Sequence, residues 1–504
     1  MEGADPMTTA STQDAAQEEH HTIDIVHADL QWIKKLTTEL NQRRQREEGP
    51  WRCSIFKVPE DIRQLDPKAF EPEVLTIGPY HHASSSKDSL MLALQDHKWH
   101  CVRRLLSRRT KCRRAATYLF GECLLAMKEI DVHVRSCYSE DLDHLSPHDL
   151  ALIMLLDACF IIHLLLKFNE DGDLTQMLVL DKEADDKQEE EEEDMAGEED
   201  MVVLDAGGGK QVDVRLAGTQ RIWMTLLYDL VKLENQIPFA IVRTLFNMLK
   251  TPRDDQINLV EIAHRLLCLT YPSKTKEYFT AAALPEGYNV RHLLHLFHST
   301  LIPSNECLVA NTPKRGMEFV WIPSATELQL AGVKFRKKEK NLTSFLDISF
   351  INGTIEIPQL TIVDFTNILF RNLIAFEQCY PHTKEYISAY AAFMDYIINT
   401  AKDVELLGLN GIITNHLGTD DAVADLFNQL DKRILLDLDR FYLLGSIWHV
   451  KNYYDSKWHQ HRARLVRDYF NNPWAILSLV AAIMLLLLTM QQSFFSAYPY
   501  FHPP

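Results

Sequence analysis

A run of 17 residues without a charged side chain, from Trp474 to Met490, lies near the end of this 504-residue chain. At about 1.5 Å per residue, a helix of that length spans roughly 25 Å, which is near the lower limit for crossing a bilayer. A buried core helix is the alternative, but such a helix usually carries a polar stripe, whereas this run is apolar on every face. The run therefore predicts a transmembrane helix over 473–490.

The residues that flank the run indicate how the predicted helix enters the membrane. Pro473 suits a first helical turn because its missing N–H would have no partner there, and Trp474 suits the headgroup level. Other apolar side chains of the run would face lipid. The predicted anchor residues are Pro473, Trp474, Leu477, Leu485, Leu488 and Met490.

The distribution of basic residues predicts the orientation of the anchor. Lys457, Arg462, Arg464 and Arg467 precede the run, whereas residues 491–504 contain neither Lys nor Arg. The positive-inside bias therefore leaves the bulk of the chain in the cytosol and sends a short tail, 491–504, across the bilayer. The length of the span does not separate the endoplasmic reticulum from the plasma membrane, because mismatch costs only fractions of a kcal/mol per Å.

Composition and charge limit the class of protein. With 46% hydrophobic and 24% charged residues, most of the chain is expected to fold around a substantial core. The nine cysteines are odd in number and form no C-x-x-C pair, so they indicate reduced thiols in the cytosol and no zinc site. The net charge of -18 argues against nucleic-acid binding. No cofactor is expected.

Composition also divides the chain into parts. Residues 181–200 hold 13 Asp and Glu against two Lys, which indicates a flexible acidic insertion. The first residues are small, polar and acidic, with no secretory signal pattern. The predicted parts are a disordered N-terminus (1–50) with a short amphipathic helix at about 22–40 that docks onto the body, a helical domain in two pieces (51–170 and 221–470), the acidic insertion (171–220), the transmembrane helix (473–490) and the tail (491–504).

Hydrophobic periodicity predicts a mainly α fold. The run LALIMLLDACFIIHLLLKF at 150–168 is nearly continuous, but Asp157 and His163 interrupt it, so a buried core helix is expected there. A last soluble helix is expected at about 437–470. Alternation with a period of two occurs only at 332–363, and Asn352-Gly353 between alternating runs predicts a hairpin. We therefore expect a multi-helix body with a small antiparallel hairpin or sheet at about 332–360.

Two groups of polar residues invite functional readings. From His97 to Arg114 the chain is basic and contains no acid. This stretch could form a solvated helix face, contact anionic lipid or contact the acidic insertion. The residues predicted to contact an anionic surface are Arg108, Arg109, Arg113 and Arg114. His81 and His82, and the histidines of RHLLHLFH at 291–298, lack the other ligands of a metal site, so structural roles are expected.

Several ordered motifs resemble the plant "domain of unknown function 247" family. They include IFKVPEDIRQLDPKAFEPEVLTIGPYHH at 55–82, LLDACFII at 155–162, KLENQIPF at 232–239, FLDISFINGTIEIPQL at 345–360 and RDYFNNPWAILSLVAA at 467–482. The resemblance covers about residues 51–490. Ala83 stands where a glycine commonly follows the histidine pair, and Leu94-Gln95 stands where Met-Glu is common.

The resemblance implies a mostly helical plant protein with a C-terminal membrane anchor and no established catalytic residues. Some grass members of the family are linked to pollen-side recognition in self-incompatibility. The leading interpretation is therefore a tail-anchored protein whose cytosolic body binds unidentified protein partners. The alternatives are an anionic-lipid-binding protein and a membrane-surface enzyme, for which His81, His82 and carboxylates at 229–234 or 377 would have to meet in one pocket.

Overall fold

The computed structural model describes residues 32–37, 53–82, 89–171, 220–273, 289–312, 317, 320–339, 344–437, 441–465 and 473–501. The predicted acidic insertion lies outside the described residues except for its two ends, as does most of the N-terminal region. Residues 32–37 form a short helical segment with exposed side chains, so the docking expected for this helix is not seen in its described part. The described chain is mainly helical, as predicted.

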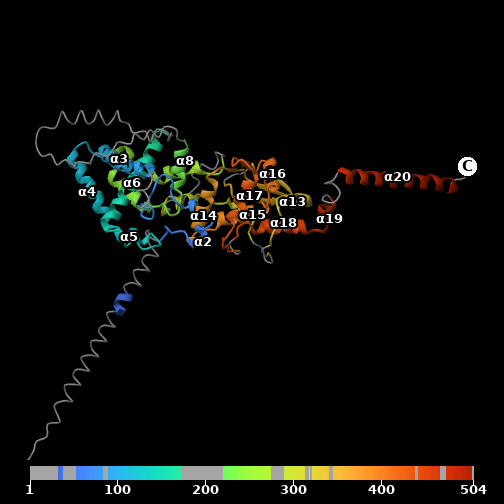
Figure 1. Ribbon diagram of the computed structural model, residues 1–504, viewed down its shortest axis with the longest axis horizontal. Coiled ribbons are helices and arrows are strands. Elements are labelled where there is room, and N and C mark those ends of the chain that lie inside the picture. Colours follow the sequence, from blue (N-terminus) through green and yellow to red (C-terminus); the bar gives the residue numbers. More distant parts are fainter. Residues whose placement is uncertain are drawn as a thin grey trace, which may run out of the picture.

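The first half of the body is a group of helices around one central helix, α6 (Figure 1). Its connections include three short 3-10 turns, η1 (Pro67–Ala69), η3 (Pro252–Asp254) and η4 (Cys268–Thr270). The helices are α2 (Glu60–Arg63), α3 (Ser89–Arg109), α4 (Arg113–Glu129), α5 (Asp131–Ser136), α6 (Pro147–Asp171), α8 (Gln220–Asp229), α9 (Phe239–Leu249), α10 (Leu259–Leu267) and α11 (Leu293–Thr300).

Helix α6 is the buried core helix that its sequence predicts. It packs against α3, α4, α9 and α10, so it is covered on several sides. Among the described residues, Pro147–Glu170 is the one segment both long and apolar enough to cross a membrane, yet 89% of its most apolar stretch is buried inside the protein. A helix that is apolar all round and covered by protein belongs to a core.

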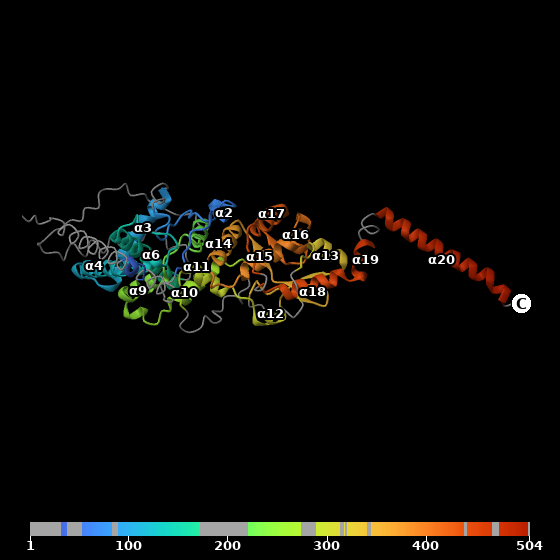
Figure 2. The ribbon, with the colours of Figure 1, turned by 90° about the horizontal axis from the view of Figure 1, so that it is seen from below.

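The second half of the body extends from the first toward the C-terminus (Figures 1 and 2). Its helices are α12 (Asn305–Ala310), α13 (Ala325–Ala331), α14 (Thr366–Cys379), α15 (Tyr386–Ile397), α16 (Ala401–Leu409), α17 (Asp420–Leu430), α18 (Leu444–Asp455) and α19 (Lys457–Leu465). One continuous hydrophobic core reaches from Ile55 to Val450 and joins both halves. In chain order the last helix, α20 (Pro473–Phe501), follows α19 and extends away from this body.

Five short strands form two small sheets in the described part of the chain. The predicted hairpin exists: β2 (Ser349–Ile351) pairs antiparallel with β3 (Thr354–Ile357), and the turn residues Asn352 and Gly353 have φ of 49° and 77°. The prediction of a purely antiparallel sheet is wrong, because β1 (Lys334–Lys337) pairs with β3 in parallel. A second sheet joins β4 (Leu360–Ile362) to β5 (Ile413–Asn415), again in parallel. Alternation reports which face a residue occupies and carries no information on strand direction.

The predicted single helix at 437–470 is two helices. Ser456 separates α18 from α19 with an extended ψ of 136°, and its N–H bonds to the carbonyl of Tyr453. Helix α19 then lies against α13: His459 Nδ1 is 2.8 Å from the Ala331 carbonyl, and Arg462 donates to the Leu330 carbonyl at 3.0 Å. This contact fixes the point of the body from which the chain leads to α20.

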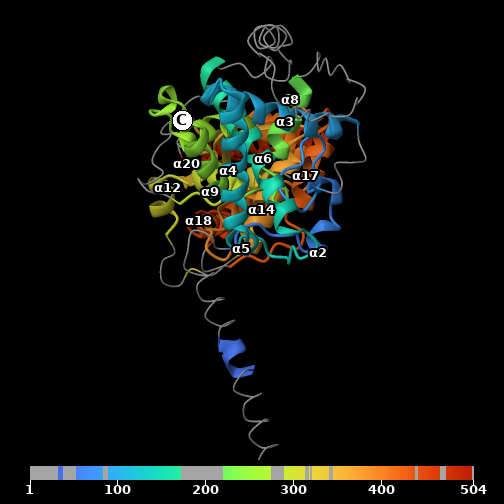
Figure 3. The same cartoon turned by 90° about the vertical axis from the view of Figure 1, so that its left-hand side faces the viewer.

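Helices α4 and α20 lie at opposite ends of the molecule (Figures 1 and 2). Figure 3 looks onto the end that α4 crosses, with α3 and α6 close behind it. Helix α20 runs to Phe501, eleven residues beyond the predicted end at Met490, so it includes most of the predicted tail. The four arginines predicted for an anionic surface, Arg108, Arg109, Arg113 and Arg114, therefore lie at the end of the body away from α20.

Candidate functional site

The loop between α8 and α9 carries a group of polar side chains that are almost completely buried. Asp229, Lys232 and Asn235 are 0% exposed, Glu234 is 1% exposed and Gln236 is 2% exposed. Pro238 ends the loop and begins α9. Charged groups are rarely buried unless they are paired and hydrogen-bonded, so this loop is the first place to look for a functional site.

Asp229 binds the backbone of the proline-rich segment 54–82. Its carboxylate accepts hydrogen bonds from the N–H groups of Glu73, Val74 and Leu75, at 3.1, 2.8 and 2.9 Å. Lys232 Nζ lies 2.9 Å from the same carboxylate and donates to the carbonyl of Glu71 at 2.6 Å. The two side chains of this ion pair thus make the backbone hydrogen bonds that a neighbouring strand would otherwise provide for an extended segment.

The next residues of the segment are held in the same way from three elements. Asn235 accepts from the Ile77 N–H at 2.6 Å and donates to the Leu75 carbonyl at 2.8 Å. Asp157 of α6 accepts from the Gly78 N–H at 2.7 Å and from Lys98 Nζ of α3 at 2.6 Å. Side chains therefore satisfy the backbone of 73–78 where no sheet does.

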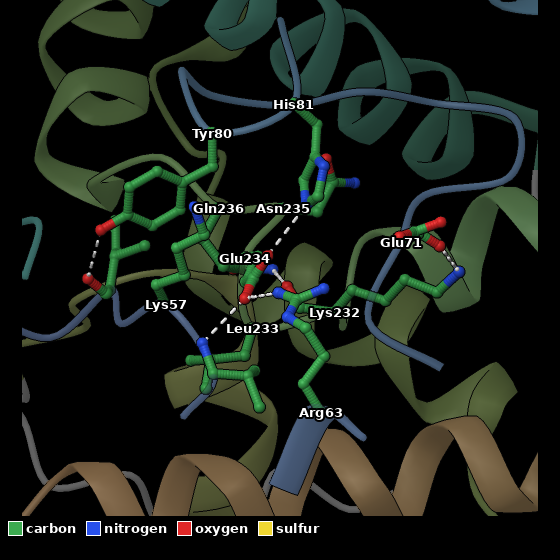
Figure 4. A network of polar contacts seen from close by, with 12 residues as sticks. Lys57, Arg63, Glu71, Tyr80, His81, Lys232, Leu233, Glu234, Asn235 and Gln236 are labelled. Atoms are coloured by element: carbon green, nitrogen blue, oxygen red, sulfur yellow. Dashed lines mark hydrogen bonds and ion pairs between the residues drawn. The ribbon is translucent and has the colours of Figure 1, made fainter. Parts of the chain in front are cut away.

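Glu234 contacts the segment 54–82 at three further points (Figure 4). It accepts from the Val58 N–H at 2.7 Å and from the guanidinium of Arg63, and His81 Nε2 lies 3.2 Å from its second oxygen. Burial alone would raise the pKa of Glu234, but the donors His81, Arg63 and Val58 outweigh it and hold the pKa below its usual value. One oxygen of Glu234 thus accepts two hydrogen bonds, whereas the second oxygen faces His81 as an ion pair without a hydrogen bond of good geometry.

A second carboxylate, Glu377 of α14, lies in a different cluster. One oxygen is 2.8 Å from His298 Nε2 and accepts from the Ile387 N–H, and the other accepts from the N–H and hydroxyl of Ser388. These donors hold the first turn of α15, so Glu377 satisfies backbone groups that a helix leaves unpaired. Through these contacts Glu377 of α14 joins the first turn of α15 to His298 of α11.

The histidines of 291–298 are buried and act on backbone groups. His292 caps α11, since its Nδ1 accepts from the His295 N–H at 3.2 Å, while its Nε2 lies 2.9 Å from the Ser54 carbonyl. Burial lowers the pKa of His292 to about 3 and that of His295 to about 2. Helix α11 is therefore largely enclosed by protein, and the imidazoles of His292 and His295 are neutral at physiological pH.

The residues required by the enzyme alternative do not meet in one pocket. His81 contacts Glu234, His82 is exposed, and Asp229 and Glu377 belong to separate clusters. Cavities of about 310, 500 and 620 Å³ open on the described surface, and other residues line them. Within the described stretches, no group of three or more His, Cys, Asp or Glu could hold a metal ion. The network around Asp229 and Glu234 holds the segment 54–82 against the core.

Sequence reasoning missed Lys98 and Asp157 as a buried pair. Lys98 was assigned to a solvated basic face, yet it is 2% exposed. The signal was present, because Leu94, Lys98, Cys101 and Leu105 recur at helical spacing and all face the core. Among the four predicted arginines, Arg108 lies 3.1 Å from Asp254 and 3.6 Å from Glu170, whereas Arg109, Arg113 and Arg114 are exposed.

The predicted anchor residues lie on one exposed helix. Pro473 begins α20, and the described apolar side chains along it are 50–75% exposed. Those predicted as anchor residues are Trp474, Leu477, Leu485, Leu488 and Met490, exposed by 75%, 60%, 65%, 58% and 63%.

Comparison with known proteins places these features in a family. Residues 55–488 match the family model DUF247, described as a plant protein of unknown function. The UPF0481 protein At3g47200 of Arabidopsis thaliana is 27% identical over 464 residues, which cover 88% of this chain and 86% of the relative. The putative UPF0481 protein At3g02645 of the same plant is 23% identical, covering 94% and 96%. No solved structure matches the chain.

Proposed function

This chain belongs to DUF247, a family of plant proteins of unknown function, and we propose that it is a single-pass membrane protein whose cytosolic helical body binds a protein partner. The observation that carries the proposal is the exposure of α20. Each large apolar side chain left in water costs about 1.5–3 kcal/mol relative to burial. A helix with a dozen of them, such as α20, requires an apolar environment that the described part of the chain does not supply.

The contrast with α6 supports this use of α20. Both helices are strongly apolar, but α6 is covered by neighbouring helices, whereas the described side chains of α20 are exposed. The helix is also longer than the predicted run 474–490, and none of its residues is charged. Its described apolar stretch, Val480–Phe495, has 16 residues, which span roughly 24 Å, somewhat less than the bilayer core of about 30 Å.

The contact between α19 and α13 supports a body that sits close to the bilayer. Arg462 and His459 bind carbonyls at the end of α13, and only residues 466–472 separate α19 from α20. Seven residues reach at most about 25 Å. Basic residues of 457–467 precede the anchor, which favours the cytosolic side for the body.

The surface farthest from α20 supports recognition of a partner from the cytosol. On α4, Tyr118 and Leu125 are 69% and 61% exposed, and they stand seven residues apart on one helix face. Val132 at the start of α5, the next helix in the chain, is 66% exposed. Exposed aromatic and aliphatic side chains of this kind anchor protein interfaces. The expected partner docks across α4, on the end shown in Figure 3.

Membrane attachment is tested by placing charges in α20. Replacing both Leu485 and Leu486 with Asp in the full-length chain should move the protein from the carbonate-resistant membrane pellet to the soluble fraction, because an acidic side chain at mid-span costs about 2.5–3.5 kcal/mol. The matched control is Leu409→Asp, at a position 81% exposed on the body. Retention of the double variant in the pellet would contradict the anchor.

Partner binding is tested by proximity labelling in plant cells. The full-length protein is compared with Tyr118→Ser/Leu125→Ser and with the control Val309→Ser/Leu409→Ser, whose positions are 75% and 81% exposed elsewhere on the body. Specific neighbours of the unmodified protein should be lost in the first variant and kept in the second. Equal labelling by all three proteins would contradict the prediction that the partner binds to α4.

A further inference from the structure

A cavity of about 310 Å³ lies between α3 and α6 and gathers basic side chains from both helices. On α3, Arg104 and Arg108 are four residues apart, and on α6 so are His163 and Lys167. Residues at this spacing share a helix face, so the two faces meet across the opening. Since α3 packs directly against α6, the cavity is built on rigid elements of the core.

The charge in this cavity is predominantly positive. Arg104, Arg108 and Lys167 line it with one carboxylate, Glu170, which lies 3.6 Å from Arg108 and is 52% exposed. The pKa of His163 is lowered to about 3, chiefly by burial and then by the nearby His97, Arg104, His100 and Lys167. The imidazole is therefore neutral, and the positive charge of the cavity belongs to Arg104, Arg108 and Lys167.

An adjoining cavity of about 500 Å³ shares Arg108 and Glu170 but has a balanced charge. There Arg253 and Arg265 are accompanied by Asp254 and Glu261. Asp254 already accepts from Arg108 at 3.1 Å and from Thr251, so its carboxylate is occupied. An anionic group would thus be attracted to the first cavity, and an uncharged remainder could extend toward the second.

We propose that the cavity between α3 and α6 binds the phosphate group of a small soluble phosphate monoester. Guanidinium groups match phosphate oxygens with two parallel hydrogen bonds, and Lys adds a third positive charge. A volume of 310 Å³ is at the lower end of ligand pockets and suits a phosphorylated metabolite. The cavity lies at the end of the body opposite α19 and α20, so a lipid headgroup of the anchor's own bilayer is the less suitable source of phosphate (Figure 1).

The direct test is calorimetric titration of the full-length protein, held in a neutral detergent at low salt, with inorganic phosphate and with glucose 6-phosphate. Both should bind saturably, whereas glucose should not. Arg104→Gln and Lys167→Gln should each weaken binding about tenfold, the effect of losing one charge-assisted hydrogen bond. The control Arg109→Gln removes an equal charge from the exposed side of α3 and should leave the affinity unchanged.

Glu170→Gln provides a test whose expected result, a gain of affinity, cannot arise from loss of folding. It removes one of the two carboxylates that compete for Arg108 and leaves the other, Asp254, in place, so the affinity for glucose 6-phosphate should rise a few-fold. Absence of saturable binding, equal loss in Arg109→Gln, or no gain in Glu170→Gln would each overturn the proposal. A further arm offers phosphatidylcholine vesicles with and without phosphatidylinositol phosphate. Preference for the phosphorylated vesicles that glucose 6-phosphate fails to compete would assign the phosphate to a lipid and overturn the soluble ligand.

Discussion

Lys98 of α3 and Asp157 of α6 meet in the interior of the protein, with Nζ and Oδ1 2.6 Å apart and side chains only 2% and 3% exposed. Around this pair the extended segment 73–78 receives hydrogen bonds from side chains of both helices and of the loop before α9. The segment is thereby fixed to the core although it forms no strand. This relationship explains how a proline-rich stretch becomes part of a helical body.

Removing Asp157 should be strongly destabilising. Asp157→Ala leaves Lys98 charged and uncompensated and the Gly78 N–H without an acceptor, so the free energy of unfolding should fall by about 3–5 kcal/mol. Urea unfolding of the full-length protein in micelles, followed by tryptophan fluorescence, measures this. Lys98→Met/Asp157→Asn should cost less than Asp157→Ala.

The control for that series is an exposed pair. Lys57 and Glu140 lie 3.4 Å apart with side chains 47% and 53% exposed. Such a pair contributes little, so Glu140→Ala should change the free energy by less than about 1 kcal/mol. A loss in Asp157→Ala no larger than that in Glu140→Ala would show that the buried pair does not hold the segment.

Gly78 is expected to tolerate no side chain. It has φ of +77°, and a Cβ there would lie 2.4 Å from the carbonyl oxygen of Gln236, within the buried loop. Gly78→Ala should therefore lower the free energy of unfolding by about 2–3 kcal/mol through strain and displaced backbone. Gly418, with φ of +95° and open space around it, is the matched position, and Gly418→Ala should cost about 1 kcal/mol. Equal losses at both positions would refute the close approach.

Asp395 should make stability depend on pH. Burial first, and repulsion by Asp431 second, raise the pKa of Asp395 from 3.8 to about 6. The folded state therefore binds this proton more tightly than the unfolded state, so the contribution is present below about pH 4 and is lost as pH rises through 6. Because the carboxyl is partly exposed, the loss should be about 1 kcal/mol.

Asp395→Asn isolates this effect. The difference in unfolding free energy between the variant and the unmodified protein should grow in favour of the variant between pH 4 and pH 6.5 and stay constant above it. A difference that is flat over this range would mean that Asp395 titrates normally.

The thiols should differ sharply in reactivity. All nine cysteines are free, and Cys112 is the exposed one, at the start of α4. Burial raises the pKa of Cys53 to about 11 and that of Cys379 to about 12, so both are protonated at neutral pH. A maleimide should label one thiol rapidly in the native protein, and Cys112→Ser should abolish that rapid phase. Rapid labelling that persists in this variant would place a second thiol at the surface.

Local patterns predicted the parts of this fold that depend on local interactions. The hairpin turn at Asn352-Gly353 followed from two residues that tolerate positive φ, and the core helix α6 followed from its apolar run. The family match over residues 55–488 confirms the resemblance that ordered motifs indicated. The hairpin turn and the apolar run of α6 are each set by neighbours within a few residues.

Long-range pairing could not be predicted in the same way. Val58 and Glu234 are 176 residues apart in the chain, and no spacing rule relates them. The parallel partner of β1 also escaped prediction, because alternation is the same for both strand directions. Lys98 illustrates an error of another kind: its charge was weighed above its helical position among Leu94, Cys101 and Leu105, and the position was decisive.

The topology of the full-length chain tests the central claim most directly. A glycosylation sequon added after Pro504 is expressed in plant cells, and the glycans are mapped after alkaline carbonate extraction. We expect the protein in the membrane pellet, with a glycan on the added sequon and none on the chain's own sequons, Asn341-Leu342-Thr343 and Asn352-Gly353-Thr354. Recovery of the intact protein in the soluble fraction without detergent, or sugar on either of those two asparagines, would contradict the account.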